Sequence, residues 1–195
     1  MKLKKYFSLY ILTVLLALPL GNYTVNAQDG SMSDSYLLLR SIKDKDYGKV
    51  RSYIQKGANV NTRDYNDGET PLYIAAKMKD VVMVTFLLNS KAKPDLAIKS
   101  TGETPLMLAV RLKAREIVKM LIEQKASLDI KDRNGETALY KAVQGNDRAS
   151  TKALLAANAD WSLTDNTGRT PLDLTLENRR LRSLIRILEN AGAEY

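Results

Sequence analysis

The stretch GETPLYIAAK, residues 68–77, is followed by three similar stretches in this chain. GETPLMLAVR begins at Gly102, GETALYKAVQ at Gly135 and a weaker copy, GRTPLDLTLE, at Gly168, so the spacings are 34, 33 and 33 residues. A second marker is GANVN at 57, KAKPD at 91, KASLD at 125, NADWS at 158 and GAEY at 192, spaced by 34, 34, 33 and 34 residues. Two markers in step indicate a structural repeat.

Within each unit the local signals predict two short helices. Thr70 before Pro71 is typical of a helix start, because Thr caps the first turn and Pro suits the first helical position. Apolar residues then follow at helical spacing, a turn is expected at 77–80, and VVMVTFLLN predicts a second helix. Polar residues at 89–101 fit a hairpin-like loop. Such a short helix pair cannot bury its own apolar face, so the units must stack.

The G-x-T-P-L-x-x-A openings, the paired aliphatic residues and the G-A-x-x-N-like closings resemble ankyrin repeats over residues 34–195. The resemblance implies an all-α solenoid of about five stacked helix–turn–helix units with hairpin-like loops. The expected units are 34–66, 67–100, 101–133, 134–166 and 167–195. The first of these is a degenerate repeat.

The chain departs from the family pattern at three positions of the repeat, one of which is Ala138 in place of Pro. The family has His after TPL, and this chain has Tyr73, Met107, Tyr140 and Asp173. The hydrogen bonds that such a His makes between repeats must therefore be replaced or lost. The turn between the two helices usually has Gly, whereas Lys79 and Lys113 stand there, which is costly if that backbone is left-handed.

The resemblance also implies one concave recognition surface, formed by the loop tips and the first helix of each unit. Carried onto this sequence, the candidate protein-binding residues are Asn66, Asp67, Glu69, Lys77, Met78, Ser100, Thr101, Glu103, Arg111, Leu112, Arg133, Asn134, Glu136, Gln144, Asn166, Thr167, Arg169, Glu177 and Asn178. This mixture of charges with a few apolar groups is typical of a protein interface with a polar rim. The glutamates have a second interpretation, as acids in the first turn of a helix, where the macrodipole favours them.

Three smaller features have a functional and a structural interpretation. Arg179, Arg180, Arg182 and Arg186 fit either contact with an acidic lipid or protein, or a solvated cap. Trp161 is expected to pack between repeats, or else to be an exposed anchor. The recurring Asp129, Asp132 and Asp165 lack the ligand-rich spacing of a calcium site, so we expect turn hydrogen bonds from them.

Composition narrows the classes of function. The 195 residues include no Cys and no His, which removes disulfides, thiolate chemistry and the commonest general base. We therefore predict no catalytic, cofactor-binding or metal-binding residues. The net charge of +8 falls to +5 without residues 1–27, which hold three lysines and no acid. Charges of both signs are interspersed, so we expect no nucleic-acid binding.

The first 27 residues have the three parts of a secretory signal. Lys2, Lys4 and Lys5 precede an apolar run at 7–18, and VNA at 25–27 offers a cleavage edge before Gln28. We predict cleavage between Ala27 and Gln28, with residues 28–33 as a short linker. The apolar run is shorter than the about 20 residues that span a bilayer. An uncleaved anchor and a buried helix remain alternatives.

Together these patterns predict an exported protein, periplasmic or secreted, that binds another protein and catalyses nothing. We expect it to be monomeric on its own, with no stable membrane insertion after cleavage. A membrane-tethered envelope adaptor, a host-directed effector and an enzyme are the alternatives. An enzyme would require a pocket with Asp or Glu residues on facing elements.

Overall fold

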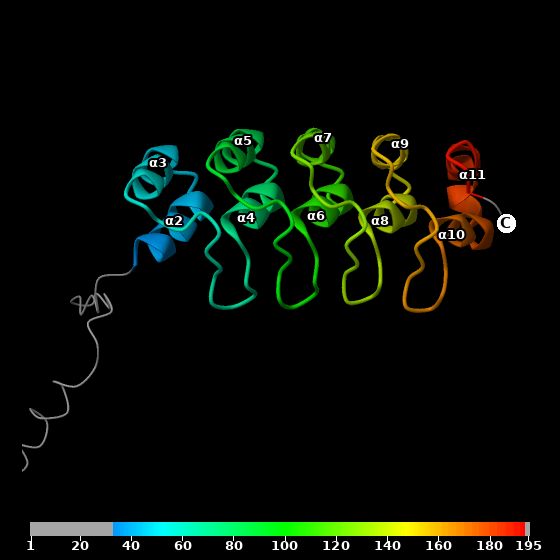
Figure 1. The fold of residues 1–195 in the computed structure, drawn as a ribbon, viewed down its shortest axis with the longest axis horizontal. Helices are drawn as coiled ribbons and strands as arrows, with labels where there is room; N and C mark the ends of the chain where they lie inside the picture. Colours follow the sequence, from blue (N-terminus) through cyan, green and yellow to red (C-terminus); the bar gives the residue numbers. More distant parts are fainter. Residues whose placement is uncertain (1–32, 194–195) are drawn as a thin grey trace, which may run out of the picture. The chain divides into compact units, whose positions relative to one another are not determined.

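The structure is a computed structural model that describes residues 33–193, where it contains ten α-helices, one 3-10 helix and no strand (Figure 1). The all-α prediction is confirmed. The predicted secretory leader and the predicted cleavage site lie outside the described residues. No helix in the described part of the chain combines the length and apolar character that crossing a membrane requires.

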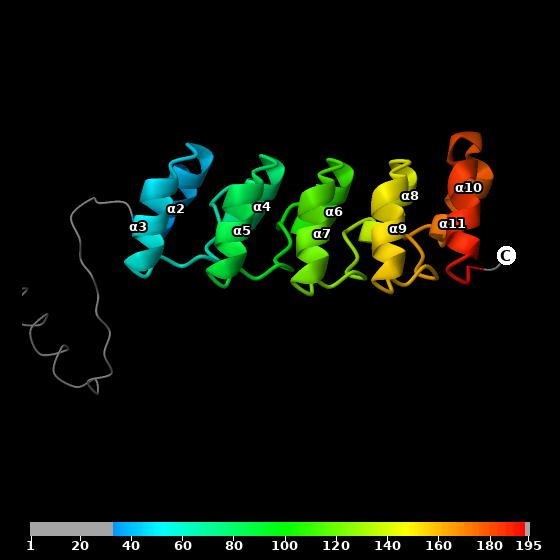
Figure 2. The ribbon, with the colours of Figure 1, turned by 90° about the horizontal axis from the view of Figure 1, so that it is seen from above.

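The helices alternate between two rows (Figures 1 and 2). The first helices of the five units are α2 (Asp34–Lys43), α4 (Pro71–Lys77), α6 (Pro105–Arg111), α8 (Ala138–Gln144) and α10 (Pro171–Glu177). The second helices are α3 (Tyr47–Gln55), α5 (Val81–Asn89), α7 (Arg115–Glu123), α9 (Arg148–Ala156) and α11 (Ile185–Glu189), the last preceded by the 3-10 helix η2 (Arg179–Leu184). Each first helix contacts the first helix of the next unit. The stack therefore grows one unit at a time.

Threonine starts four of the first helices, as the sequence predicts. Thr70, Thr104, Thr137 and Thr170 each accept a hydrogen bond from the backbone N–H three residues on, at 3.2 Å. Pro follows three of them at the first helical position, where its missing N–H costs nothing. These starts place every first helix at the same point of the repeat.

The core runs along the first helices. Residues 71–76 of α4 and 105–110 of α6 are all buried, because each helix is covered by its neighbours on both sides and by the second helix of its own unit. Leu121 of α7 is also fully buried, whereas Lys119 on the same helix is exposed. Only one face of a second helix packs, so the second helices form an outer surface.

The backbone of the turn between the two helices is left-handed, which is the conformation that the sequence analysis expected to be costly for lysine. Lys79 and Lys113 have φ values of 54° and 53°, and Asn146 has 50° at the same place in the fourth unit. In this region Cβ crowds the following carbonyl oxygen, and Asn tolerates the conformation better than Lys. The strain expected from these lysines is therefore present.

Four hairpin loops, at 56–70, 90–104, 124–137 and 157–170, project beyond the first helices (Figure 1). Neighbouring loop tips are joined by single backbone bonds, namely Lys99 N–H to Asp67 O at 3.1 Å, Arg133 N–H to Thr101 O at 2.9 Å and Asn166 N–H to Asn134 O at 3.0 Å. Gly135 allows the last of these, since a Cβ there would lie 2.7 Å from the backbone nitrogen of Asn166. The loops thus form a linked row.

The recurring aspartates hold these loops. Asp132 accepts the backbone N–H of Asn134 and of Glu136, and Asp129 accepts that of Asp160 in the next unit. Asp165 accepts from Thr167 and Arg169. The turn interpretation is confirmed for Asp132 and Asp165, whereas Asp129 links two neighbouring units instead. Among the described residues no group of three or more His, Cys, Asp or Glu is placed to hold a metal ion.

The C-terminal cap is not one continuous α-helix. Residues 179–184 form η2, and only 185–189 are α-helical. Arg182 and Arg186 therefore lie on different helix types, so the adjacency expected of residues four apart on one α-helix does not apply. Leu181, Leu184 and Leu188 are buried beneath. Trp161 is half-buried and packs against the core, as expected.

Candidate protein-binding face

One side of the array is formed by the loop tips together with the C-terminal ends of the first helices, and is called here the hairpin-side face. In each full unit the residue before the Thr cap contacts the residue eight positions later, at the helix end. The pairs are Glu69–Lys77 at 2.7 Å, Glu103–Arg111 at 2.8 and 3.0 Å, Glu136–Gln144 at 3.3 Å and Arg169–Glu177 at 3.4 Å. The fifth unit has the reverse polarity. These pairs bring the predicted loop and helix residues together.

Glu69 and Glu103 lie on the predicted face, but they form its floor. They are 7% and 6% exposed, so their carboxylates are buried rather than offered to a partner. The helix-dipole interpretation is also wrong, because both residues precede the Thr cap and lie outside the helix. The loop returns beneath the helix end, and the acid neutralises the cation there.

The other candidate residues are accessible. Met78, Leu112, Glu136 and Arg169 are half-buried. The exposed ones are Asn66, Asp67, Lys77, Ser100, Thr101, Arg111, Arg133, Asn134, Gln144, Asn166, Thr167, Glu177 and Asn178. The face therefore presents the ends of the pairs together with the polar loop tips.

Tyrosines replace the missing histidines as links between units. The Tyr73 hydroxyl donates to Oε2 of Glu103 in the next unit at 2.6 Å, and the Tyr140 hydroxyl donates to Oδ2 of Asp165 at 2.5 Å. Burial, and then the bond to Glu103, raises the pKa of Tyr73 far above its ordinary value. The sequence signalled this role, since both tyrosines occupy the position where the family has His. Only the structure identifies the carboxylates that these tyrosines bind.

Glu103 stays ionised despite its burial. Desolvation alone raises the pKa of this carboxyl, but the hydrogen bonds from Arg111 and Tyr73 together outweigh it, so the net pKa is lowered. The same pairing raises the pKa of the Arg111 guanidinium. The pair therefore carries fixed opposite charges at neutral pH.

The link between the third and fourth units is different, because Met107 has no hydroxyl. Lys141 has a side chain only 10% exposed, and its Nζ lies 2.7 Å from Asp132 and 2.6 Å from Glu136. Desolvation lowers the pKa of Lys141, but its two carboxylate partners raise it more. Sequence reasoning missed this residue. The available signal was a lysine where the other units have Ile74, Leu108 and Leu174.

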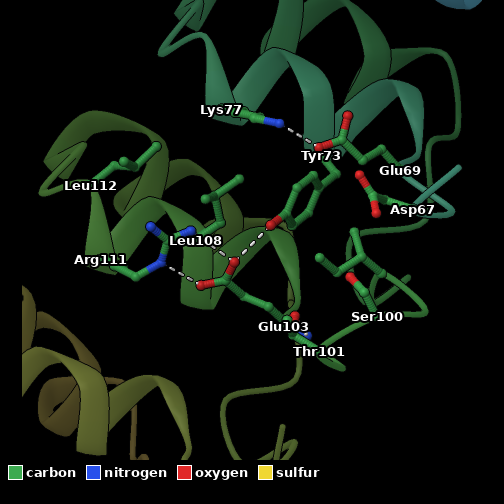
Figure 3. Close-up of a pocket in the computed structure, with 11 residues that line it drawn as sticks. Asp67, Glu69, Tyr73, Lys77, Ser100, Thr101, Glu103, Leu108, Arg111 and Leu112 are labelled. Atoms are coloured by element: carbon green, nitrogen blue, oxygen red, sulfur yellow. Dashed lines mark hydrogen bonds and ion pairs between the residues drawn. The ribbon is translucent and has the colours of Figure 1, made fainter. Parts of the chain in front are cut away.

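A pocket of about 330 Å³ opens on the hairpin-side face between the second and third units (Figure 3). Eight of its lining residues belong to the predicted set, namely Asp67, Glu69, Lys77, Ser100, Thr101, Glu103, Arg111 and Leu112. Tyr73, Ile98 and Leu108 complete the lining and were not predicted. Ile98 stands where the other loops have Asp64, Asp132 and Asp165, so this loop position contributes an apolar wall instead of a carboxylate.

Comparisons with known proteins agree with this geometry. A family model described as ankyrin repeats in three copies matches residues 38–132, and a second, described as ankyrin repeats in many copies, matches residues 121–174. The human protein named 2-5A-dependent ribonuclease is 30% identical to this chain over 80 residues. That segment is 41% of this chain and 11% of the human protein, so the chain matches about a tenth of that relative's length.

Proposed function

This chain belongs to the ankyrin-repeat proteins, and on that premise we propose that it is an exported, non-catalytic scaffold that binds another protein through its hairpin-side face. One observation carries the proposal. The less exposed partner of the helix-end pair is Glu in three successive units, while the exposed partner changes from Lys77 to Arg111 to Gln144. A constant frame with variable exposed ends is what recognition by many modest contacts requires.

The hairpin-side face has the other features of a protein interface. Its charged pairs and polar loop tips surround a pocket whose wall includes Leu108 and Leu112. An apolar centre with a polar rim is the usual arrangement at such interfaces.

An enzyme is the second class, because the pocket does hold acids from two neighbouring units. Its chemistry argues against general acid–base work. The pKa of Glu103 is lowered and that of Tyr73 is raised, so each moves away from neutral pH, where a catalytic acid or base is most effective. The human relative's name denotes a ribonuclease, but this chain matches 11% of it and has no His or Cys. We propose no nuclease activity here.

Export rests on the leader alone. Three lysines, a twelve-residue apolar run at 7–18 and a small-residue edge at Ala27 support cleavage before Gln28. N-terminal sequencing of the protein recovered from periplasm and medium tests this. A mature start at Gln28 supports export, and an intact leader in the membrane fraction supports the tethered adaptor instead. Recovery in a host cell would favour the effector.

Crosslinking capture from native cells tests the binding face. The variant carries Lys77→Gln, Arg111→Gln and Leu112→Ala, where Gln is the residue that the fourth unit has at this position, beside a Glu136 that Lys141 neutralises. The control carries Val82→Ala, Lys119→Ala and Lys152→Ala, three exposed residues on the second helices. Both must keep the circular dichroism of the parent.

We expect the face variant to lose its crosslinked partners and the control to keep them. Equal recovery by the face variant would show that binding occurs elsewhere. Loss by the control alone would assign the outer surface of the second helices.

A further inference from the structure

The last residue of each first helix is exposed, and these five residues form one row along the hairpin-side face. In chain order the row is Lys43, Lys77, Arg111, Gln144 and Glu177. Its charge is therefore positive over the first three units, neutral at the fourth and negative at the fifth. We call it the helix-end row.

The cations of the row are presented outward, and their acids lie beneath. The side chains of Lys77 and Arg111 are 58% and 54% exposed, whereas those of their partners Glu69 and Glu103 are 9% and 8% exposed. Lys43 shows the same arrangement, 50% exposed and 3.6 Å from Asp64, whose side chain is 12% exposed. A partner approaching this face meets the cations first.

These cations keep donors for a second anion. Lys77 has three N–H groups, and Glu69 takes one of them. Arg111 uses its Nε and one Nη2 hydrogen on Glu103, out of five donors. The remaining donors are free to bind a carboxylate from outside through charge-assisted hydrogen bonds, which are stronger than neutral ones.

The pocket lies between two members of the row. Lys77 and Arg111 stand on opposite sides of it, and Leu108 and Tyr73 lie between them (Figure 3). A volume of about 330 Å³ exceeds that of any single side chain, so one apolar side chain of a partner fits with room for solvent. The site therefore combines an apolar wall with two exposed cations, whose acids Glu69 and Glu103 lie beneath them and line the pocket together with Asp67.

At the other end of the row the polarity changes. The side chain of Glu177 is 58% exposed and that of its partner Arg169 is 42% exposed, at 3.4 Å. Since a like charge placed opposite costs free energy, this end rejects the acids that the first three units favour. The row thus has a direction.

We propose that the helix-end row selects an acidic protein segment, whose carboxylates lie on Lys43, Lys77 and Arg111 and whose single apolar side chain enters the pocket between the second and third units. This rests on the proposed function, because it names the kind of partner for the same face. Neighbouring packed helices lie about 10 Å apart, so acids every third residue of an extended chain, or every seventh of a helix, match the spacing.

Selection from a displayed library of random 16-residue peptides tests the proposal. The wild type should enrich peptides rich in Asp and Glu that contain an aliphatic or aromatic residue. Lys77→Gln and Arg111→Gln should each weaken binding of the enriched peptides about tenfold, the usual effect of losing one charged hydrogen bond. The control variants Lys119→Gln and Lys152→Gln remove the same charge from the second helices and should change nothing.

The outcomes separate this inference from the proposed function. Enriched peptides that are not acidic but lose binding on Leu112→Ala overturn the acidic partner and leave the face intact. Peptides that bind all face variants equally overturn both. Enrichment of none overturns the inference, and the crosslinking experiment then decides the function. If a single-stranded oligonucleotide competes as well as the peptides do, the helix-end row binds any polyanion and does not select a protein segment. The proposal is then wrong.

Discussion

The hydroxyl of Tyr73 in α4 donates a hydrogen bond to Oε2 of Glu103, at 2.6 Å, and so ties the second unit to the third. The same carboxylate accepts two bonds from Arg111, the last residue of α6 in its own unit. Stability in a repeat array is a sum of unit terms and nearest-neighbour interface terms. A buried bond of this kind therefore belongs to the interface term, and the following predictions probe such contacts.

Replacing Tyr73 by Phe removes one hydroxyl that donates to the buried carboxylate of Glu103. We expect the free energy of unfolding in urea to fall by about 1–2 kcal/mol, since the bond to an ionised carboxylate is lost while Arg111 still neutralises it. Tyr53→Phe is the control, because it keeps the ring that Lys56 contacts. A loss as large for Tyr53→Phe would refute the assignment.

Glu103→Gln should make the free energy of unfolding depend less on pH in the acidic range. The pKa of Glu103 is lowered in the folded state, so its contribution is present above the ordinary value of 4.5 and is lost as pH falls through the folded value. We expect the wild type to be more stable by about 1–3 kcal/mol at pH 7, with the difference shrinking as pH falls below 4.5 and through the lowered folded-state pKa. Urea unfolding at several pH values measures it. A difference that does not vary with pH would contradict the ionised assignment.

Lys141→Met should be strongly destabilising, although Met is the better core residue. The change leaves Asp132 and Glu136 without their shared cation, at a cost of about 3–5 kcal/mol for a broken buried pair. Lys152→Met on the exposed side of α9 should stay within about 0.5 kcal/mol. Thermal and urea unfolding compare the two. Equal effects would show that Lys141 is not held as a buried ion.

Ala114→Asp should stabilise the protein by about 1 kcal/mol by supplying a missing cap. Asp80 accepts the backbone N–H of Met83 at the start of α5, whereas Ala114 gives α7 no side-chain cap. Asp80→Ala is the converse control and should destabilise. The midpoint of urea unfolding measures both, and no rise for Ala114→Asp would mean that α7 does not accept this cap.

Lys113→Gly should relieve the left-handed turn before α7. The φ of 53° strains a lysine, and Gly adopts it freely, so we expect a gain of about 0.5–1 kcal/mol after the added entropy of the unfolded chain. Lys119→Gly, inside α7, should instead lose about 1 kcal/mol. Gains or losses of the same sign would show that the turn is not strained.

The fold followed from the sequence because its signals are local. Thr70 and Pro71 start a helix through contacts within one turn, and Gly135 allows a left-handed bend whatever else surrounds it. A period of 33 or 34 residues then requires that every unit repeat the same local structure. The sequence alone also determined the residues that differ between units.

The tertiary structure decided which of those residues face a partner. Glu69 and Lys77 meet because the loop folds back under the helix, and Tyr73 meets Glu103 because two units stack in one register. Neither distance is set by residues adjacent in the chain, since each contact depends on the packing of an entire unit. The same packing decided which side chains are buried. It left Lys77 and Arg111 exposed, placed Ile98 in the pocket wall and held Lys141 between two acids.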